Sequence, residues 1–426
     1  MRPGSCCNAR GRRAKVMWTL SLLALGLALA ACGKSSSSST APAAASNAAA
    51  SSSVSSSSPP ASGCGTVPSL PIQDSSGVIA SLGSTYKTAY NGYSDPIYPS
   101  AYAHFKPKQT SGFTIGMVYP VPFNSYLAQL IPQTQKELAA IKGVSHVTVL
   151  TTPPTGVNAQ IQQVNQLIQQ HVSVIVVVPW VAQAVIPLAA KAEQAGIPVI
   201  SILDPMATKN AITIAPNGTG GGAIVAAEIA RLIGGKGTVV GVHGVPATSV
   251  DQAQFAGYKA GFAKCPGISF DASLVGQYQV PVAKQQLLTY LSSHPQPVAG
   301  AIEIATMGPA IIQAFQQTGR PMPALGLGDP DASDLAYWSA HKSSVKAVAA
   351  VLGAPDTARA TAYTVAHLLS GHGPKISEIS QPSALVTADN LSQFLVPGAG
   401  PTSQANVNGP PGSWLPDSYL GPLFNQ

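Results

Sequence analysis

The sequence predicts an α/β protein built from two doubly wound lobes, and three neighbouring stretches carry this prediction. Val172–Val178 is an almost unbroken run of β-branched apolar residues, as expected for a strand buried on both faces. Val181–Ala195 has apolar residues at helical spacing and ends at Gly196, where a left-handed C-cap is favourable. Ile197–Leu203 is a second apolar strand. Such a β-α-β unit requires a parallel sheet with a right-handed crossover.

The same alternation of strand and helix extends along the chain from Phe113. Before the central unit we expect strands at 113–119 and 147–150, a helix from Asn124 or Ser125 to Lys142, and a helix over 157–170. After it, strands are expected at 212–215, 238–242, 272–275, 298–304, 324–327 and 345–352. Helices are expected over 218–233, 248–264, 282–292, 308–318, 334–341 and 356–369. The chain therefore forms two similar, Rossmann-like lobes, and a cleft between lobes is a common place for a small ligand.

The first 31 residues have the pattern of a signal peptide. Five basic residues up to Lys15 precede an apolar segment, Val16–Ala31, which ends just before Cys32. Leu29-Ala30-Ala31-Cys32 resembles the lipobox of bacterial lipoproteins, which implies cleavage before Cys32 and a lipid on its thiol. An ordinary signal peptide followed by a chance cysteine is the alternative. Residues 32–64 are rich in Ser and Ala and predict a flexible tether.

Composition favours an exported protein and excludes a nucleic-acid binder. Only 9% of the 426 residues are charged, a low fraction for a cytosolic protein. The net charge of +7 falls to +2 once the five basic residues of the signal peptide are removed. Cys64 and Cys265 then remain in an oxidising compartment, either as a disulfide or as two free thiols. No cysteine and histidine set has zinc spacing, and neither a metal nor a cofactor is expected.

Two segments lie outside the predicted lobes. Residues 65–112 form an N-terminal extension, with a weak helix over 77–90 and a Tyr- and Pro-rich extended run over 93–108. We expect this run to pack on the following domain, with its aromatic residues used for packing. Residues 398–426 form a C-terminal tail that is rich in Gly, Pro and Asn and is expected on the surface.

Eight short motifs occur between residues 113 and 397 in an order typical of one protein family. They are Val121–Tyr126, Val178–Trp180, Gly196–Ile200, Asn217 with Gly221-Gly222, Gly244–Tyr258, Met307-Gly308, Leu325–Asp329 and Pro355-Asp356. Together they resemble the type I periplasmic binding proteins, the ribose-binding-like branch of the substrate-binding proteins of ABC importers. That family's chain crosses between its lobes three times and closes them by a hinge motion.

The resemblance implies the domain organisation and the partners. Lobe one would comprise 113–217 and 354–380, and lobe two 218–353 and 381–397. The protein would be a monomer in the cell envelope, periplasmic or anchored to the outer face of the cytoplasmic membrane through Cys32. It would capture a small molecule and deliver it to an ABC permease. The ligand-presenting subunit of a sensory system is the alternative, and sequence alone does not separate the two.

The resemblance also implies a ligand site of eight residues in the cleft: Phe123, Asn124, Trp180, Asp204, Asn217, Gln254, Tyr278 and Asp329. Sugar-binding members hold hydroxyls with Asn, Asp, Arg and Gln and stack a ring on the sugar. Here Val121, Val178 and Ile304 stand in place of asparagines, and Gln254 replaces an arginine. We therefore interpret the cleft as more apolar and aromatic than a sugar site, suited to a less polar ligand.

Some of these residues have simpler structural explanations, which the sequence leaves open. Trp180 can pack between the lobes, Asp204 can cap a turn before Pro205, and Asn217 can hold the crossover into lobe two. Gly218–Gly222 lacks the full pattern of a nucleotide-binding loop, so close helix packing explains it better.

Catalysis is not expected from this sequence. The G-x-S-x-G motif of hydrolases does not occur. His243, Ser249 and Asp251 lie close together in sequence, and such a short segment rarely supplies a catalytic triad. Asp329 and Asp331 offer only two carboxylates, whereas calcium takes six or more oxygen ligands.

Overall fold

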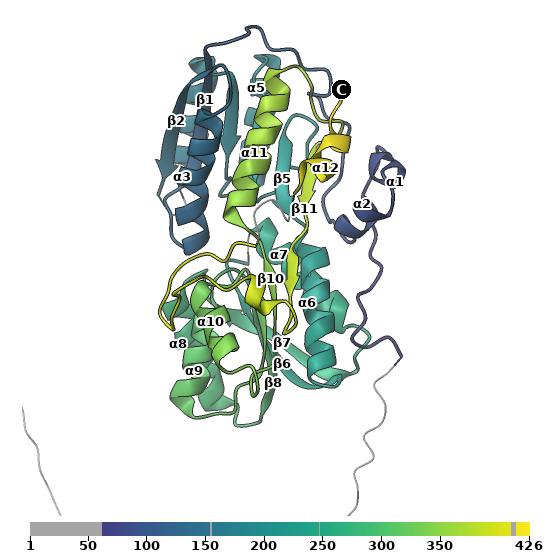
Figure 1. Ribbon diagram of the computed structural model, residues 1–426, viewed down its shortest axis with the longest axis vertical. Helices are drawn as coiled ribbons and strands as arrows, with labels where there is room; N and C mark the ends of the chain where they lie inside the picture. The colour runs from purple at the N-terminus through teal and green to yellow at the C-terminus, as the bar shows by residue number, and fades with distance from the viewer. Residues whose placement is uncertain (1–61, 154–155, 247, 410–414) are drawn as a thin grey trace, which may run out of the picture. The chain divides into compact units, whose positions relative to one another are not determined.

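The computed structural model describes residues 62–153, 156–246, 248–409 and 415–426. The predicted signal peptide, Cys32 and all but the last residues of the tether lie outside these ranges. The described chain contains two six-stranded sheets with helices packed on them, which confirms the α/β architecture of two lobes (Figure 1). The chain passes from one sheet to the other after β5, after β10 and after β11.

Sheet one has the strand order β11-β5-β4-β3-β1-β2, and its paired strands are parallel. Its strands are β1 (Phe113–Pro120), β2 (Val144–Thr152), β3 (Val174–Val177), β4 (Val199–Ile202), β5 (Ile212–Pro216) and β11 (Glu378–Gln381). Every residue of β3 and β4 is buried, as expected for strands covered on both faces. Gly196 follows α5 with a φ of 77°, the left-handed conformation predicted for it.

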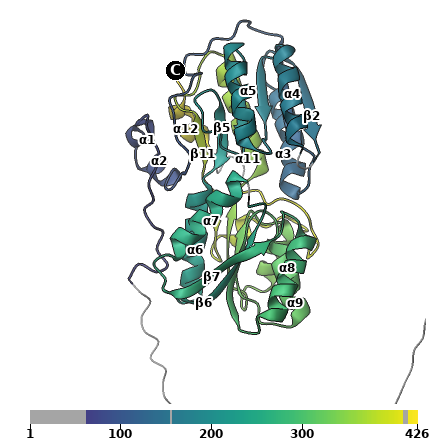
Figure 2. The same cartoon turned by 180° about the vertical axis from the view of Figure 1, so that it is seen from behind.

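Two helix pairs cover sheet one. On one face α3 (Ser125–Ala139) packs against α11 (Ala354–Leu369), and on the other α4 (Val157–Gln169) packs against α5 (Ala182–Gln194) (Figures 1 and 2). Asn124 begins α3, because its side-chain oxygen accepts a hydrogen bond from the Leu127 amide at 2.9 Å.

Sheet two has the order β12-β10-β9-β8-β6-β7, with β12 antiparallel to β10. Its strands are β6 (Lys236–His243), β7 (Gly267–Val275), β8 (Val298–Glu303), β9 (Ala324–Gly328), β10 (Ala347–Val351) and β12 (Ala384–Val386). Its helices are α6 (Gly218–Leu232), α7 (Ser249–Phe262), α8 (Val280–Ser293), α9 (Gly308–Thr318) and α10 (Ala332–Ala340). The two sheets match position by position, so β1 corresponds to β6 and β4 to β9.

Glycines let α6 and α7 approach each other closely. A Cβ atom on Gly222 would lie 2.3 Å from the Gln254 carbonyl oxygen, and one on Gly257 would lie 2.2 Å from the Thr219 carbonyl oxygen. Any larger residue at either position would push the two helices apart. Helix packing therefore accounts for the glycine run at the start of α6.

The N-terminal extension packs on the lobes, as predicted for its aromatic run. Tyr90, Tyr93 and Tyr102 are buried. The single helix expected over 77–90 is wrong, because Gly83, with a φ of 95°, separates α1 (Val78–Ser81) from α2 (Ser84–Ala89). The two remaining cysteines form the disulfide Cys64–Cys265.

The C-terminal tail is not the surface segment that its composition predicts. Leu415, Leu420 and Leu423 are fully buried, and Tyr419 stacks on Tyr86 of α2 with ring centroids 4.8 Å apart. The tail holds α12 (Asp417–Leu420) and a 3₁₀ turn, η2 (Gly421–Leu423), while η1 (Leu391–Gln393) precedes it. A few apolar side chains therefore outweigh the Gly and Pro content around them. None of the helices that the structure describes combines the length and apolar character that crossing a bilayer demands.

Candidate functional site

A cavity of about 150 Å³ lies at the carboxyl ends of strands from both sheets, where open parallel sheets bind their ligands. All eight residues expected at the ligand site line it. From sheet one come Phe123, Asn124, Trp180, Asp204 and Asn217, and from the segments of sheet two come Gln254, Tyr278 and Asp329. The chain topology therefore brings the eight residues together, and their contact with a ligand remains a prediction.

Three aromatic side chains form a cluster at this cavity, in which one pair of rings is stacked and the other is tilted. The Phe123 ring stacks on Trp180 with a centroid distance of 5.7 Å and lies 6.3 Å from the Tyr278 ring. Phe123 is 36% exposed, an unusual exposure for a large apolar residue. Because Tyr278 follows β7 and the other two residues follow strands of sheet one, this aromatic cluster joins the two lobes. Trp180 both lines the cavity and packs against Phe123 in this aromatic cluster.

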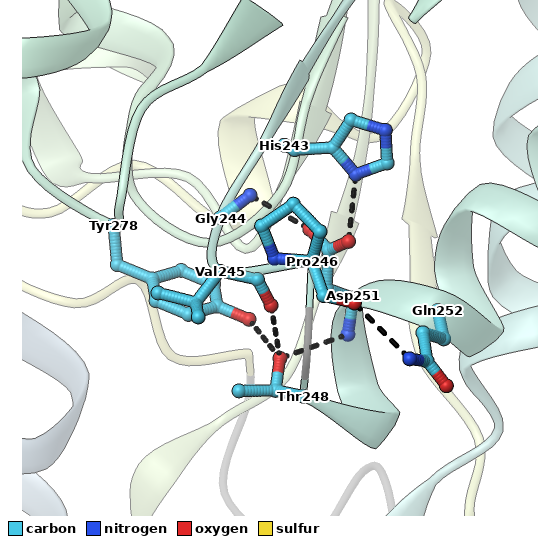
Figure 3. Close-up of polar contacts among 8 residues, drawn as sticks. All are labelled: His243, Gly244, Val245, Pro246, Thr248, Asp251, Gln252 and Tyr278. Carbon is cyan, nitrogen blue, oxygen red and sulfur yellow. Dashed lines mark hydrogen bonds and ion pairs between the residues drawn. The ribbon is translucent and has the colours of Figure 1, made fainter. Parts of the chain in front are cut away.

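The aromatic rings are fixed by hydrogen bonds at their polar ends. The Trp180 indole N–H donates to the Thr152 hydroxyl at 3.0 Å, and its backbone amide donates to Gln160 Oε1 at 2.9 Å. The Tyr278 hydroxyl lies 2.8 Å from the Thr248 hydroxyl at the start of α7 (Figure 3). These partners hold the rings in place before any ligand arrives, which lowers the entropic cost of binding.

Asn217 uses its side chain to build the fold. Its Oδ1 accepts from the Gly220 amide at 2.9 Å and so caps α6, while its Nδ2 donates to the Ala89 and Asn91 carbonyls of the extension. The side chain thus holds the crossover into lobe two, which was the simpler of its two explanations. Its place on the cavity wall leaves contact with a ligand as a prediction.

Asp329 is anchored in a similar way. Its Oδ1 accepts from the Leu352 amide at 3.1 Å, and its Oδ2 accepts from Asn406 Nδ2 at 3.3 Å. Burial raises the pKa of this carboxyl to about 8, although both hydrogen bonds act in the opposite direction. The residue also has a φ of 58°, a strained conformation of the kind that clusters at functional sites.

The other polar candidates have partners within the protein as well. Asp204 accepts a hydrogen bond from the Ser249 hydroxyl at the start of α7, and burial raises its pKa to about 6. Gln254 Nε2 donates to the Tyr258 hydroxyl at 2.6 Å. Much of the hydrogen-bonding capacity of the cavity wall is therefore already used within the protein, which leaves few donors and acceptors for a ligand.

His243, at the end of β6, and Asp251, in α7, are in contact and connect the strand to the helix (Figure 3). His243 Nδ1 lies 2.6 Å from Asp251 Oδ2, while the Gly244 amide donates to Asp251 Oδ1 at 2.7 Å. Ser249 does not complete a triad, because its hydroxyl donates to Asp204. Among the described residues, no group of three or more His, Cys, Asp or Glu side chains is arranged to hold a metal ion.

One apolar replacement is placed differently from the expectation. Val178 and Ile304 line the cavity, but Val121 is not part of its wall. The Val121 amide instead donates to the Thr152 carbonyl at 2.9 Å, which extends the pairing of β1 with β2. Sequence reasoning also missed Asn406, since it lies in the tail that was expected on the surface. It missed the lining role of Thr248 as well, which it placed only at the start of the helix expected over 248–264.

The chain is similar to known proteins in both sequence and fold. A family model described as a periplasmic binding protein domain matches residues 115–373. The xylitol-binding protein of Mycolicibacterium smegmatis is 29% identical over 174 residues, which cover 40% of this chain and 50% of that protein. The chain thus matches about half the length of this curated relative.

Solved structures of ABC transporter solute-binding proteins share the fold. The one from Thermobispora bispora has a TM-score of 0.61 at 21% identity, covering 68% of this chain and 90% of its own. The one from Mycobacterium smegmatis, with bound glycerol, has a TM-score of 0.61 at 18% identity, covering 70% and 100%. The one from Burkholderia graminis, in complex with D-arabinose, has a TM-score of 0.60 at 20% identity, covering 68% and 100%.

Proposed function

This chain belongs to the periplasmic binding protein family, and on that premise we propose that it captures one small neutral molecule in its interlobe cavity and presents it to the permease of an ABC importer. One observation supports the proposal above the others. The residues expected at a ligand site, far apart in sequence, all line a single cavity at the carboxyl ends of both sheets. Closure of two lobes on a ligand would give a permease a surface that differs from that of the empty protein.

The cavity size favours a small molecule. A buried water needs about 10–15 Å³ by the same measure of volume. A cavity of about 150 Å³ therefore accommodates roughly ten non-hydrogen atoms. A compound of the size of a five-carbon sugar alcohol or a small aromatic alcohol would fill it.

The polar groups of the wall favour a ligand with few hydroxyls. Asn217, Asp329 and Asp204 already make hydrogen bonds within the protein. A buried ligand hydroxyl without a partner costs about 1–3 kcal/mol. The stacked rings of Phe123 and Trp180 add apolar surface that a weakly polar or aromatic ligand can cover.

The relatives support a second ligand class. The curated relative is named for binding xylitol, and the Burkholderia graminis structure holds D-arabinose. A polyol or sugar is therefore the competing candidate. A polyol or sugar needs many hydrogen-bonding partners on the cavity wall, whereas a weakly polar ligand needs few.

A thermal-shift experiment on the full-length protein separates the two classes with xylitol, D-arabinose and 2-phenylethanol as probes. A ligand at about 100 times its dissociation constant stabilises the folded state by about 2.7 kcal/mol. We expect the larger shift with 2-phenylethanol, and a shift produced only by the polyol or the sugar would overturn the argument from the polar groups. Phe123→Ala should abolish the shift, whereas Val67→Ala, an exposed residue outside this cavity, should retain it.

The lipid anchor is a further part of the proposal. Cys32 lies outside the described residues, and its sequence context supports attachment to the outer face of the cytoplasmic membrane. Because the tether ends at Cys64, which is bonded to Cys265, the anchor would connect to the folded protein at lobe two. Labelling cells with a radioactive fatty acid should mark the wild-type protein but not Cys32→Ser, and equal labelling of both would disprove anchoring through Cys32.

A further inference from the structure

Two serine–aspartate hydrogen bonds connect the lobes on the two sides of the cleft. The Ser125 hydroxyl, at the start of α3, donates to Asp331 Oδ1, at the start of α10. The Ser249 hydroxyl, at the start of α7, donates to Asp204 Oδ1, just after β4. Each bond therefore joins a segment that follows a strand of sheet one to a segment that follows a strand of sheet two.

The two bonds occupy equivalent places in the two lobes. Ser125 follows β1 and Ser249 follows β6, and these strands hold the same position in the order of their sheets. Asp204 follows β4 and Asp331 follows β9, which also correspond. Each lobe thus supplies a serine from the helix that follows β1 or β6 and receives, from the other lobe, a carboxylate located after the matching strand.

The helix caps free both serines for this contact. Asn124 caps α3 by accepting from the amide three residues on, and Thr248 caps α7 by accepting from the Asp251 amide at 3.4 Å. Ser125 and Ser249 are the first helical residues after these caps, so their hydroxyls are not needed to satisfy the helix ends. The Val250 amide of α7 also donates to Asp204, which places that carboxylate at the positive end of the helix.

We propose that Ser125–Asp331 and Ser249–Asp204 are a reciprocal pair of latches that stabilises the closed arrangement of the two lobes over the ligand cavity. The inference rests on the proposed binding function, since closure has a purpose only if the cavity takes a ligand. Ser125, Ser249 and Asp331 do not line the cavity, so they act as positioning residues rather than as ligand contacts. A hydrogen bond to a charged group changes such an equilibrium by roughly tenfold or more.

The latches also make closure dependent on pH. Burial is the largest cause that raises the pKa of Asp204 and of Asp331 to about 6. Asp95 and the Tyr278 phenol face Asp204, while Asp329 and Asp334 face Asp331. Separation of the lobes would return each carboxyl to water and to its ordinary pKa near 4. The closed form then binds protons more tightly, so acid favours closure and a rise through pH 6 weakens it.

Hydrogen exchange of the ligand-free, full-length protein tests the latches directly. Ser125→Ala and Ser249→Ala should each raise the exchange of the amides around residues 125–127 and 249–251 roughly tenfold, and the double variant should exceed both. Exchange within the central strands β3 and β8 should not change. Ser344→Ala is the matched control, because this exposed hydroxyl donates to the backbone of its own lobe.

The pH profile gives the second readout. After correction for the intrinsic pH dependence of amide exchange, the opening equilibrium of these two segments should increase by about tenfold per carboxyl between pH 5 and pH 8. Asp331→Asn keeps an acceptor oxygen but cannot titrate, so this variant should show only one of the two tenfold increases. Exchange equal to that of Ser344→Ala, an increase spread over every strand, or a flat pH profile would each refute the latches. If exchange responds as expected while no probe compound binds, the latches stand and the proposed binding function fails.

Discussion

Raising the pH from 6 to 9 is expected to destabilise the folded protein, because burial raises the pKa of Asp329 and of other buried carboxyls, among them Glu303 and Glu378. Burial raises the pKa of the Asp329 carboxyl to about 8 in the fold, against about 4 in an unfolded chain. A group whose pKa is raised by folding contributes stability that is fully present below its unfolded pKa and is lost as the pH rises through its folded pKa. The loss at Asp329 should therefore extend from about pH 4 to about pH 8 and level off above pH 8, so most of the change between pH 6 and pH 9 occurs below pH 8.

The magnitude follows from the difference in protons bound. Between pH 6 and pH 9, a carboxyl with a folded pKa of about 8 loses about 2.7 kcal/mol of stabilisation. Asp204 and Asp331, with pKa values of about 6, each lose about 0.4 kcal/mol more. These three carboxyls together should thus lower the free energy of unfolding by about 3.5 kcal/mol, which corresponds to a decrease of several degrees in Tm. Burial of Glu303, Asp334 and Glu378 raises their pKa values and acts in the same direction.

Differential scanning calorimetry of the ligand-free protein at pH 6, 7, 8 and 9 measures this effect. Asp329→Asn keeps an oxygen to accept from the Leu352 amide but cannot titrate, so its unfolding free energy should fall by about 2.7 kcal/mol less than that of the wild-type protein over the same range. A Tm that is constant or rises toward pH 9 in the wild-type protein would show that the Asp329 carboxyl is not protonated in the fold, and the account of its burial would be wrong.

Three further changes test the parts of the chain that hold the cavity. Cys265→Ser should cost about 2–5 kcal/mol of stability in urea titrations, and reduction of the wild-type protein should give the same loss. Asn217→Ala should cost about 2–4 kcal/mol, because it leaves the Gly220 amide and the Asn91 carbonyl without this partner, and an unchanged urea midpoint would contradict this. Truncation after residue 409 removes the buried Leu415, Leu420 and Leu423 and should prevent stable folding, as checked by circular dichroism.

Much of the fold could be predicted because its signals are local. The buried run Val174–Val177, the capping side chain of Asn124 and the left-handed Gly319 each determine a nearby boundary without help from distant residues. Strand β11 was missed for the opposite reason. Its sequence, Glu378–Gln381, is largely polar, and it is a strand because it pairs with β5 and because Tyr93 donates to the Glu378 carboxylate at 2.8 Å.

The location of the candidate site could also be predicted, since parallel strands bring their carboxyl ends to one edge of a sheet. The hydrogen-bond partners at the site could not. Asn406 contacts Asp329 across 77 positions of sequence, and the interlobe partner of Asp204 is a helix-start serine 45 positions away. Contacts of this kind depend on how the two lobes pack, and no pattern within one segment encodes them.

Asn217 shows why a polar residue on a cavity wall does not by itself describe the ligand. Its amide faces the cavity region, yet the same atoms cap α6 and hold the Ala89 and Asn91 carbonyls. A ligand that took one of these hydrogen bonds would leave a backbone group unsatisfied, at about 1–3 kcal/mol, and would gain little net affinity. The quantity that limits ligand polarity is therefore the hydrogen-bonding capacity left after folding, and at Asn217 and Asp329 the fold has already used most of it.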